Sequence, residues 1–164
     1  MPKVTITDSK GLVQETGSGI DIRSVGAVGT VVAAAQSITS TGAGNTDFQL
    51  AVPAGALIVD AGVIITTAVV VNSAANITCT VGVGSAGNAD LSASANIGSA
   101  VTAIPINTAF GTSIQNEGAA TLSFKTTAPL HRTADTTVFI RVANDSNNVT
   151  AGAARAFVRY MMIG

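Results

Sequence analysis

The most conspicuous motif in the sequence is residues 82–87, GVGSAG, which reproduces the G-x-G-x-x-G spacing of a dinucleotide-binding loop. That loop binds a pyrophosphate where it joins a strand to a helix in a βαβ unit, with an acidic residue about 20 positions later. No alternation of strands and helices surrounds the motif here, and the region near position 107 offers Asn107 rather than a carboxylate. We therefore interpret the string as a glycine-rich turn and expect no nucleotide cofactor.

Side chains that act as nucleophiles, bases or metal ligands are few. His131 is the only histidine, and its position beside Arg132 is typical of a solvated loop. Cys79 is the only cysteine, so it has no partner for an intramolecular disulfide, and its apolar neighbours favour an inert buried thiol. Residues 144–148, NDSNN, are rich in oxygen ligands for Ca²⁺ but lack the repeated carboxylates of a strong site, which favours a turn. We expect no catalytic site, no metal site and no enzymatic activity.

Asp60 is the one charge embedded in the apolar stretch 57–64. A buried carboxylate is costly unless it is paired or hydrogen-bonded. The neighbouring Gly62 indicates a bulge or bend that brings the carboxylate out of the core or onto backbone N–H groups. Two interpretations remain open: a structural role, or a salt bridge between subunits to Arg141 or Arg155.

The composition sets limits on what this chain is. It has 164 residues, of which 47% are hydrophobic and only 10% are charged, where about 25% charged is typical. A disordered chain needs the opposite balance. The net charge of -1 offers no basic field for nucleic acid. The longest apolar run, 57–71, is short and contains polar residues, so we expect no membrane segment.

The pattern from Gly26 onward predicts β structure, because Val, Ile and Thr dominate and turn clusters recur at short intervals. Residues 88–116 are expected to form a long loop with one helical turn over 91–95. The segment 56–71 is long enough to form two strands, with a break at residues 60–62. Seven or eight strands without helices predict an all-β fold, a jelly-roll-like β-sandwich over residues 26–164. The strands are expected near 28–39, 46–52, 56–71, 76–83, 120–126, 136–143 and 153–163.

The last two strands are expected to form a hairpin that pivots at Asn148, which places position 141 opposite 155 and position 139 opposite 157. One face of this hairpin then belongs to the core, with Val138, Ile140, Val142, Ala156, Val158 and Tyr160. The other face gathers aromatic and arginine side chains, a composition typical of interface cores. Opposed like charges on such a face favour an acidic partner; the alternative is a solvated outer face. The predicted oligomer interface comprises Asp60, Phe139, Arg141, Arg155, Phe157 and Arg159.

Residues 1–25 differ from the rest, because charged residues and glycines are interleaved there. Val4 and Ile6 alternate with threonines, which indicates a short strand with nothing obvious to pack against. We expect an extended N-terminal arm that becomes ordered on a partner surface. The alternative is a terminus that stays disordered.

Three stretches, 52–63, 81–90 and 151–160, resemble small virion proteins of tailed bacteriophages, especially the cement or decoration proteins of the capsid. The resemblance implies a jelly-roll-like domain, commonly a homotrimer, that is assembled in the host cytoplasm and binds the major capsid protein on the outer surface of an icosahedral head. It also implies that the arm grips the capsid. A fibre knob that recognises a host-surface polysaccharide is the alternative, and a β-sandwich hydrolase or lyase is a more distant one. The expected capsid-binding arm residues are Val4, Ile6, Lys10, Leu12, Ile20, Ile22 and Arg23.

Overall fold

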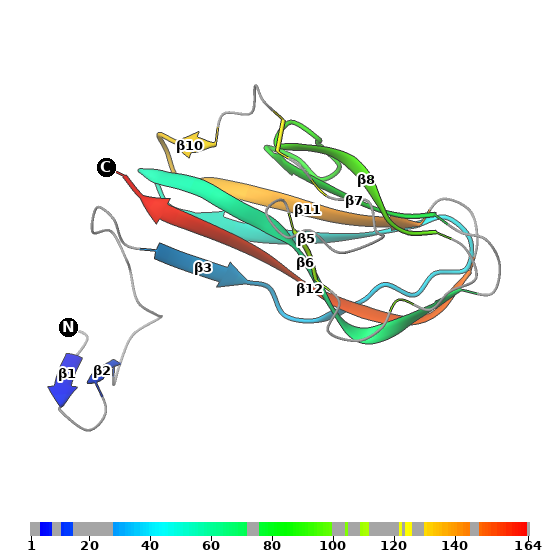
Figure 1. Cartoon of the computed structure of the whole chain (residues 1–164), viewed down its shortest axis with the longest axis horizontal. Coiled ribbons are helices and arrows are strands. Elements are labelled where there is room, and N and C mark those ends of the chain that lie inside the picture. Colours follow the sequence, from blue (N-terminus) through cyan, green and yellow to red (C-terminus); the bar gives the residue numbers. More distant parts are fainter. Residues whose placement is uncertain are drawn as a thin grey trace.

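Two antiparallel β-sheets pack face to face in the computed structural model of the chain (Figure 1). Sheet 1 contains β3 (Val28–Val32), β4 (Gln36–Ser37), β6 (Ala56–Val71), β9 (Ala109–Gly111), β10 (His131–Arg132) and β12 (Val149–Met162). Sheet 2 contains β5 (Gly44–Val52), β7 (Asn76–Val83), β8 (Ser92–Ser99) and β11 (Thr136–Asn144). The structure describes residues 4–7, 11–14, 28–71, 76–99, 104, 109–111, 122, 124–125, 130–144 and 148–163.

The strand order is that of a jelly roll. Sheet 1 runs β10-β6-β12-β3, with β9 also paired to β6 and β4 to β12, and sheet 2 runs β5-β11-β7-β8. Early strands pair with late ones in nested fashion: β3 and β4 with β12, β5 with β11, β6 with β9 and β10, and β7 with β8. This is the pattern of a long hairpin wrapped into two sheets. The predicted all-β, jelly-roll-like sandwich is therefore confirmed.

The predicted hairpin between the last two strands is wrong, because β11 and β12 lie in different sheets. Arg141 is opposite Asp47 and Thr80, whereas Arg155 is opposite Ile64. In a jelly roll the chain crosses from one sheet to the other between these strands, so they meet across the core instead of side by side. The predicted core face is nevertheless correct: Val138, Ile140, Val142, Ala156, Val158 and Tyr160 are all buried.

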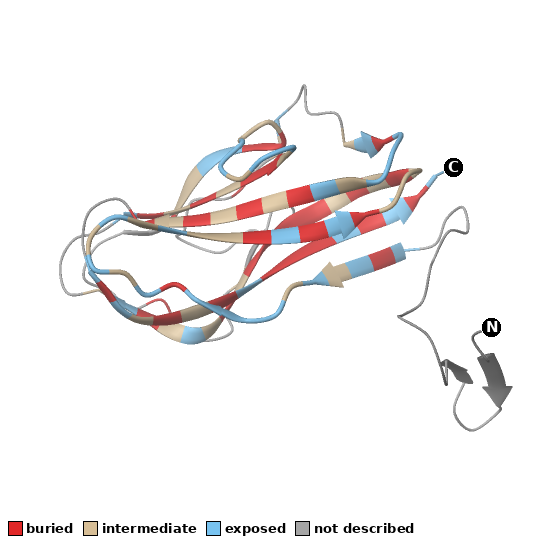
Figure 2. Ribbon diagram, turned by 180° about the vertical axis from the view of Figure 1, so that it is seen from behind, coloured by how far each residue is buried: buried red, intermediate tan, exposed pale blue. Residues whose placement is uncertain are grey.

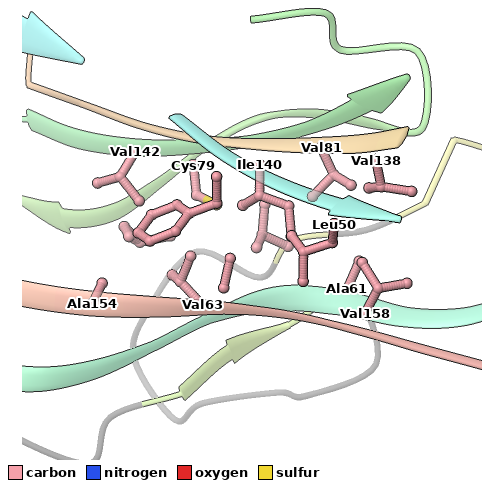
Figure 3. Close-up of a cluster of buried hydrophobic side chains, with 14 of the residues drawn as sticks. Leu50, Ala61, Val63, Cys79, Val81, Val138, Ile140, Val142, Ala154 and Val158 are labelled. Carbon is pink, nitrogen blue, oxygen red and sulfur yellow. The ribbon is translucent and has the colours of Figure 1, made fainter. Parts of the chain in front are cut away.

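The core lies between the two sheets, where side chains from β5, β6, β7, β11 and β12 meet (Figure 3). Along β5, Phe48 and Leu50 are buried while Gln49 and Ala51 are exposed, and other strands alternate similarly (Figure 2). This period of two is what a strand with one face on the core requires. Complete burial of a side chain such as that of Phe48 contributes about 1.5–3 kcal/mol.

Strand β6 is continuous, but it carries a bulge at the point where a break was expected. Asp60 is opposite Arg159 and Ile58 is opposite Tyr160, so Val59 is an extra residue on β6. The bulge changes which residues face inward: Ile58 and Ala61 both face the core, and Asp60 faces out of the sandwich. The bulge inferred from Asp60 and Gly62 is confirmed.

Residues 92–99 form strand β8, so the loop with a helical turn that was expected there is wrong. Ser, Asn and Gly have low strand propensity, but pairing with β7 and burial of Leu91 and Ile97 outweigh it. The strand expected over 28–39 is divided into β3 and β4. In the expected strand 120–126, the described residues form one bridge, between Phe124 and Ser92. Among the described residues there is no helix that could cross a membrane.

The N-terminal arm contains a short antiparallel hairpin of β1 (Val4–Thr7) and β2 (Gly11–Gln14). Its register places Ile6 opposite Leu12 and Val4 opposite Gln14. The expected arm residues Lys10, Ile20, Ile22 and Arg23 lie outside the described residues.

Candidate interaction surface

The six predicted interface residues do not share one surface. Phe139 and Arg141 lie on the outer face of sheet 2, whereas Arg155, Phe157 and Arg159 lie on the outer face of sheet 1. The prediction of a common face is wrong because it depended on the hairpin that the structure lacks. The bulge in β6 directs Asp60 toward the outer side of sheet 1, opposite Arg159, where it is almost completely buried.

The register of β3, β12 and β6 arranges the outer face of sheet 1 in rows. Thr30, Arg159 and Asp60 form one row. Val32, Phe157 and Gly62 form the next. Beyond them Arg155 lies opposite Ile64, and at the other end Val28 lies opposite Met161. The outer face of sheet 1, as the name is used below, consists of Val28, Thr30, Val32, Asp60, Gly62, Ile64, Arg155, Phe157, Arg159 and Met161.

An open depression of about 310 Å³ lies in this face. Two of its lining residues are almost completely buried, with exposed fractions of 3% for Asp60 and 5% for Phe157. Phe157 is opposite Gly62 on the neighbouring strand β6. The depression is lined by Thr30, Val32, Asp60, Ile64, Phe157 and Arg159.

Large hydrophobic residues are exposed around the depression. Val28 is 55% exposed, Val32 51% and Met161 37%, and all three lie on this one face. In the described part of the chain the only other exposed large hydrophobic residues are Val70 and Ile163. Single exposed apolar side chains are ordinary, but a cluster rimmed by polar groups marks an interaction site.

Two arginines on β12 complete the face. Arg155 and Arg159 are both exposed, and within the described part of the chain neither guanidinium has an ion-pair or hydrogen-bond partner. They flank Phe157, since alternate residues of a strand point to the same side. The result is an aromatic side chain between two free positive charges.

Arg141, on the outer face of sheet 2, is engaged within the chain. Its Nε and Nη2 donate hydrogen bonds to the two carboxylate oxygens of Asp47 at 2.6 and 2.8 Å. This hydrogen bonding raises the pKa of Arg141, with burial acting in the opposite direction and the charge of Asp47 adding to it. Asp60 and Arg141 lie on the outer faces of opposite sheets, so the salt bridge considered between them would have to join two copies of the chain.

The glycine-rich string is a turn between β7 and β8, as interpreted from the sequence. Gly84 and Gly87 have φ values of +84° and +82°, which side chains disfavour. The turn is fastened where Val83 N donates to Asp90 Oδ1 at 2.9 Å and Asn88 Nδ2 donates to the Val83 carbonyl at 2.7 Å. It folds back over the outer face of sheet 2, where the backbone of Gly87 lies against the Arg141 guanidinium.

The other residues considered as possible catalytic groups or metal ligands do not come together in one site. His131 is exposed in β10, and Cys79 is buried in the core, where burial raises the pKa of its thiol to about 12. Asn144 and Asn148 secure a turn: Asn144 Nδ2 donates to Ser40 Oγ, and Asn148 Oδ1 accepts from Gly42 N. Among the residues that the structure describes, no three His, Cys, Asp or Glu side chains gather as they would around a metal ion.

Sequence reasoning missed Val28, Thr30, Val32 and Met161. The alternation along β3 places Val28, Thr30 and Val32 on one face, but the pattern alone does not say whether that face is covered. Val28, Thr30 and Val32 are exposed on β3, which lies at the end of the described strand order of sheet 1. No protein-family model, curated protein or solved structure matches this chain.

Proposed function

We propose that the chain is a structural virion protein, a capsid decoration or cement protein that binds the outer surface of an icosahedral phage head as an oligomer. The observation that carries the proposal is the outer face of sheet 1, where exposed valines and Met161 surround an aromatic side chain between two free arginines. Such a face stabilises an assembly by burying apolar area that a lone molecule leaves in water. The sequence resemblance to cement proteins supports the same function, with the major capsid protein as partner.

The N-terminal arm is the second element of the proposal. Hairpin β1–β2 has only four residue pairs, and an isolated two-stranded hairpin is marginally stable at best. Its apolar residues Val4, Ile6 and Leu12 therefore need a surface, and the capsid supplies one. In a trimer three such arms bind together, so each needs only a modest affinity.

Jelly rolls also occur in lectin domains, and the alternative function is that of a head- or tail-fibre knob that binds a host-surface glycan. The half-buried Phe139, on the outer face of sheet 2 beside the exposed amide of Gln49, is the feature that favours it.

Co-sedimentation with purified heads that lack the protein tests the proposal. A decoration protein binds the heads in many copies, in proportion to the major capsid protein, and light scattering gives its subunit count in solution. A fibre knob is present in few copies per particle and binds cells or glycans. Failure to bind heads in any amount would contradict the decoration function.

A further inference from the structure

We propose that the outer face of sheet 1 is the surface that docks on the shell, and that the shell presents carboxylates and an apolar side chain to it. This inference rests on the proposed function and adds which face meets the capsid and by what chemistry. It also changes the role of Arg155, Phe157 and Arg159 from contacts between copies of the chain to contacts with the capsid.

The charged residues of the face indicate which groups the partner surface must carry. Arg155 and Arg159 are four residues apart on β12 and on the same side, which separates their Cα atoms by about 13 Å. The one acidic residue of the face, Asp60, is 3% exposed, so the surface offered to a partner is positive. Two carboxylates at a similar spacing complement it.

The same charges disfavour a second copy of this face as the occupant. In a two-fold contact the same patch lies on both subunits. Such a contact would bring Arg155 and Arg159 of both copies together, and facing like charges are destabilising.

The depression supplies the apolar part of the contact. Val32, Ile64 and Phe157 form apolar walls, and the volume of about 310 Å³ is open to the surface. Pockets of this kind, apolar at the centre with arginine at the rim, are where interfaces concentrate their binding energy. An apolar side chain of the capsid protein is the expected occupant.

The place of the arm in the sequence agrees with the proposal that the outer face of sheet 1 lies on the capsid. The arm precedes β3 in the sequence, and Thr30 and Val32 of β3 line the depression. Thirteen residues separate Gln14 from Val28, which span up to about 45 Å when extended. An arm that grips the capsid therefore begins at the edge of a face that lies on the capsid, while its hairpin can reach a neighbouring capsid subunit.

The test compares two changes of equal charge, Arg159→Glu on this face and Lys125→Glu at an exposed site elsewhere. Binding to heads that lack the protein is measured by co-sedimentation at low and moderate salt, and subunit count by light scattering. We expect Arg159→Glu to weaken binding about ten-fold or more, and Lys125→Glu to bind as the unaltered chain does. Val32→Trp, which fills the depression without changing charge, should also weaken binding. Subunit count should stay the same in all three variants.

Circular dichroism and thermal melting verify that each variant is folded. If Arg159→Glu is not, Arg159→Gln and Arg155→Gln remove the charges without reversing them. Full binding by the folded variants, while the unaltered chain binds, overturns this inference and leaves the decoration function intact. A changed subunit count in Arg159→Glu also overturns it, because the face then belongs to a contact between copies. If the unaltered chain does not bind heads at all, both the inference and the proposed function are wrong.

Discussion

Asp60 lies directly opposite Arg159 in the antiparallel pair of β6 and β12, on the outside of the sandwich. The bulge at Val59 is the reason, because without an extra residue the alternation that buries Ile58 would direct Asp60 into the core. A carboxylate there would have to be desolvated. The bulge thus turns Asp60 away from the apolar core and places it opposite an arginine, although its side chain stays almost completely buried.

This register predicts energetic coupling between the two residues. Cross-strand pairs of opposite charge contribute about 0.2–1 kcal/mol, so a double-mutant cycle of Asp60→Ala and Arg159→Ala should give a coupling free energy in that range. Urea unfolding of the four chains measures it. A parallel cycle with Arg155→Ala, which removes a residue opposite Ile64, should show no coupling to Asp60. Equal coupling in both cycles would contradict the register.

The turn between β7 and β8 should depend on Gly87. Its φ of +82° is strained for any side chain, and an added Cβ would collide with the Arg141 guanidinium. Gly87→Ala should therefore lower the free energy of unfolding by more than about 1 kcal/mol.

Gly42→Ala is the matched control for this prediction, because its φ is +90° and an added Cβ would meet nothing within 4 Å. Gly42→Ala measures the cost of the backbone strain alone. The further loss of unfolding free energy in Gly87→Ala then measures the collision with the Arg141 guanidinium. Gly87→Ala should lower the free energy of unfolding by less when Arg141 is already Ala than it does in the unaltered chain. A Gly87→Ala variant no less stable than Gly42→Ala would show that the contact with Arg141 is unimportant.

The buried thiol of Cys79 predicts how stability changes at alkaline pH. Burial raises its pKa from an ordinary value of 9.0 to about 12. The unfolded chain loses the thiol proton first, so the stabilisation is complete below pH 9 and is lost as the pH rises toward 12. The free energy of unfolding should fall by up to about 1.4 kcal/mol per pH unit in this window.

Unfolding of Cys79→Val, followed over pH 8 to 10, provides the reference, since the substituted chain lacks the titrating group. As the pH rises above 9, the free energy of unfolding of the unaltered chain should fall relative to that of Cys79→Val. A constant difference would mean that the thiol ionises equally well in the folded protein. Reaction with a thiol reagent should be slow until the chain unfolds, because the thiolate is the reactive form.

Removal of residues 1–25 tests the arm. The core of the jelly roll lies within residues 38–162, so the shortened chain should keep its fold and its subunit count. Binding to heads should be lost, because the arm is the proposed gripping element. Retained binding, measured by co-sedimentation beside the full chain, would show that the arm is dispensable.

The sequence by itself determined which residues form most of the strands and which side of the last two strands enters the core. The alternation in 46–52, 56–71, 76–83 and 136–143 is strong enough to predict β5, β6, β7 and β11 closely. The glycine-rich string could be recognised as a turn because its surroundings lack a helix pattern. In all these cases the information is local: it resides in the period of two and in residues that favour turns.

Only the tertiary structure decided which strands are neighbours. A period of two tells which side chains of β11 and β12 face the core, but the pattern is the same whether the strands pair or face each other across it. The free energy that separates the two arrangements comes from pairing between segments far apart in the chain, such as β3 with β12 and β5 with β11. For the same reason β8 forms despite its low propensity, Arg141 pairs with Asp47, and Arg155 and Arg159 are left to face outward.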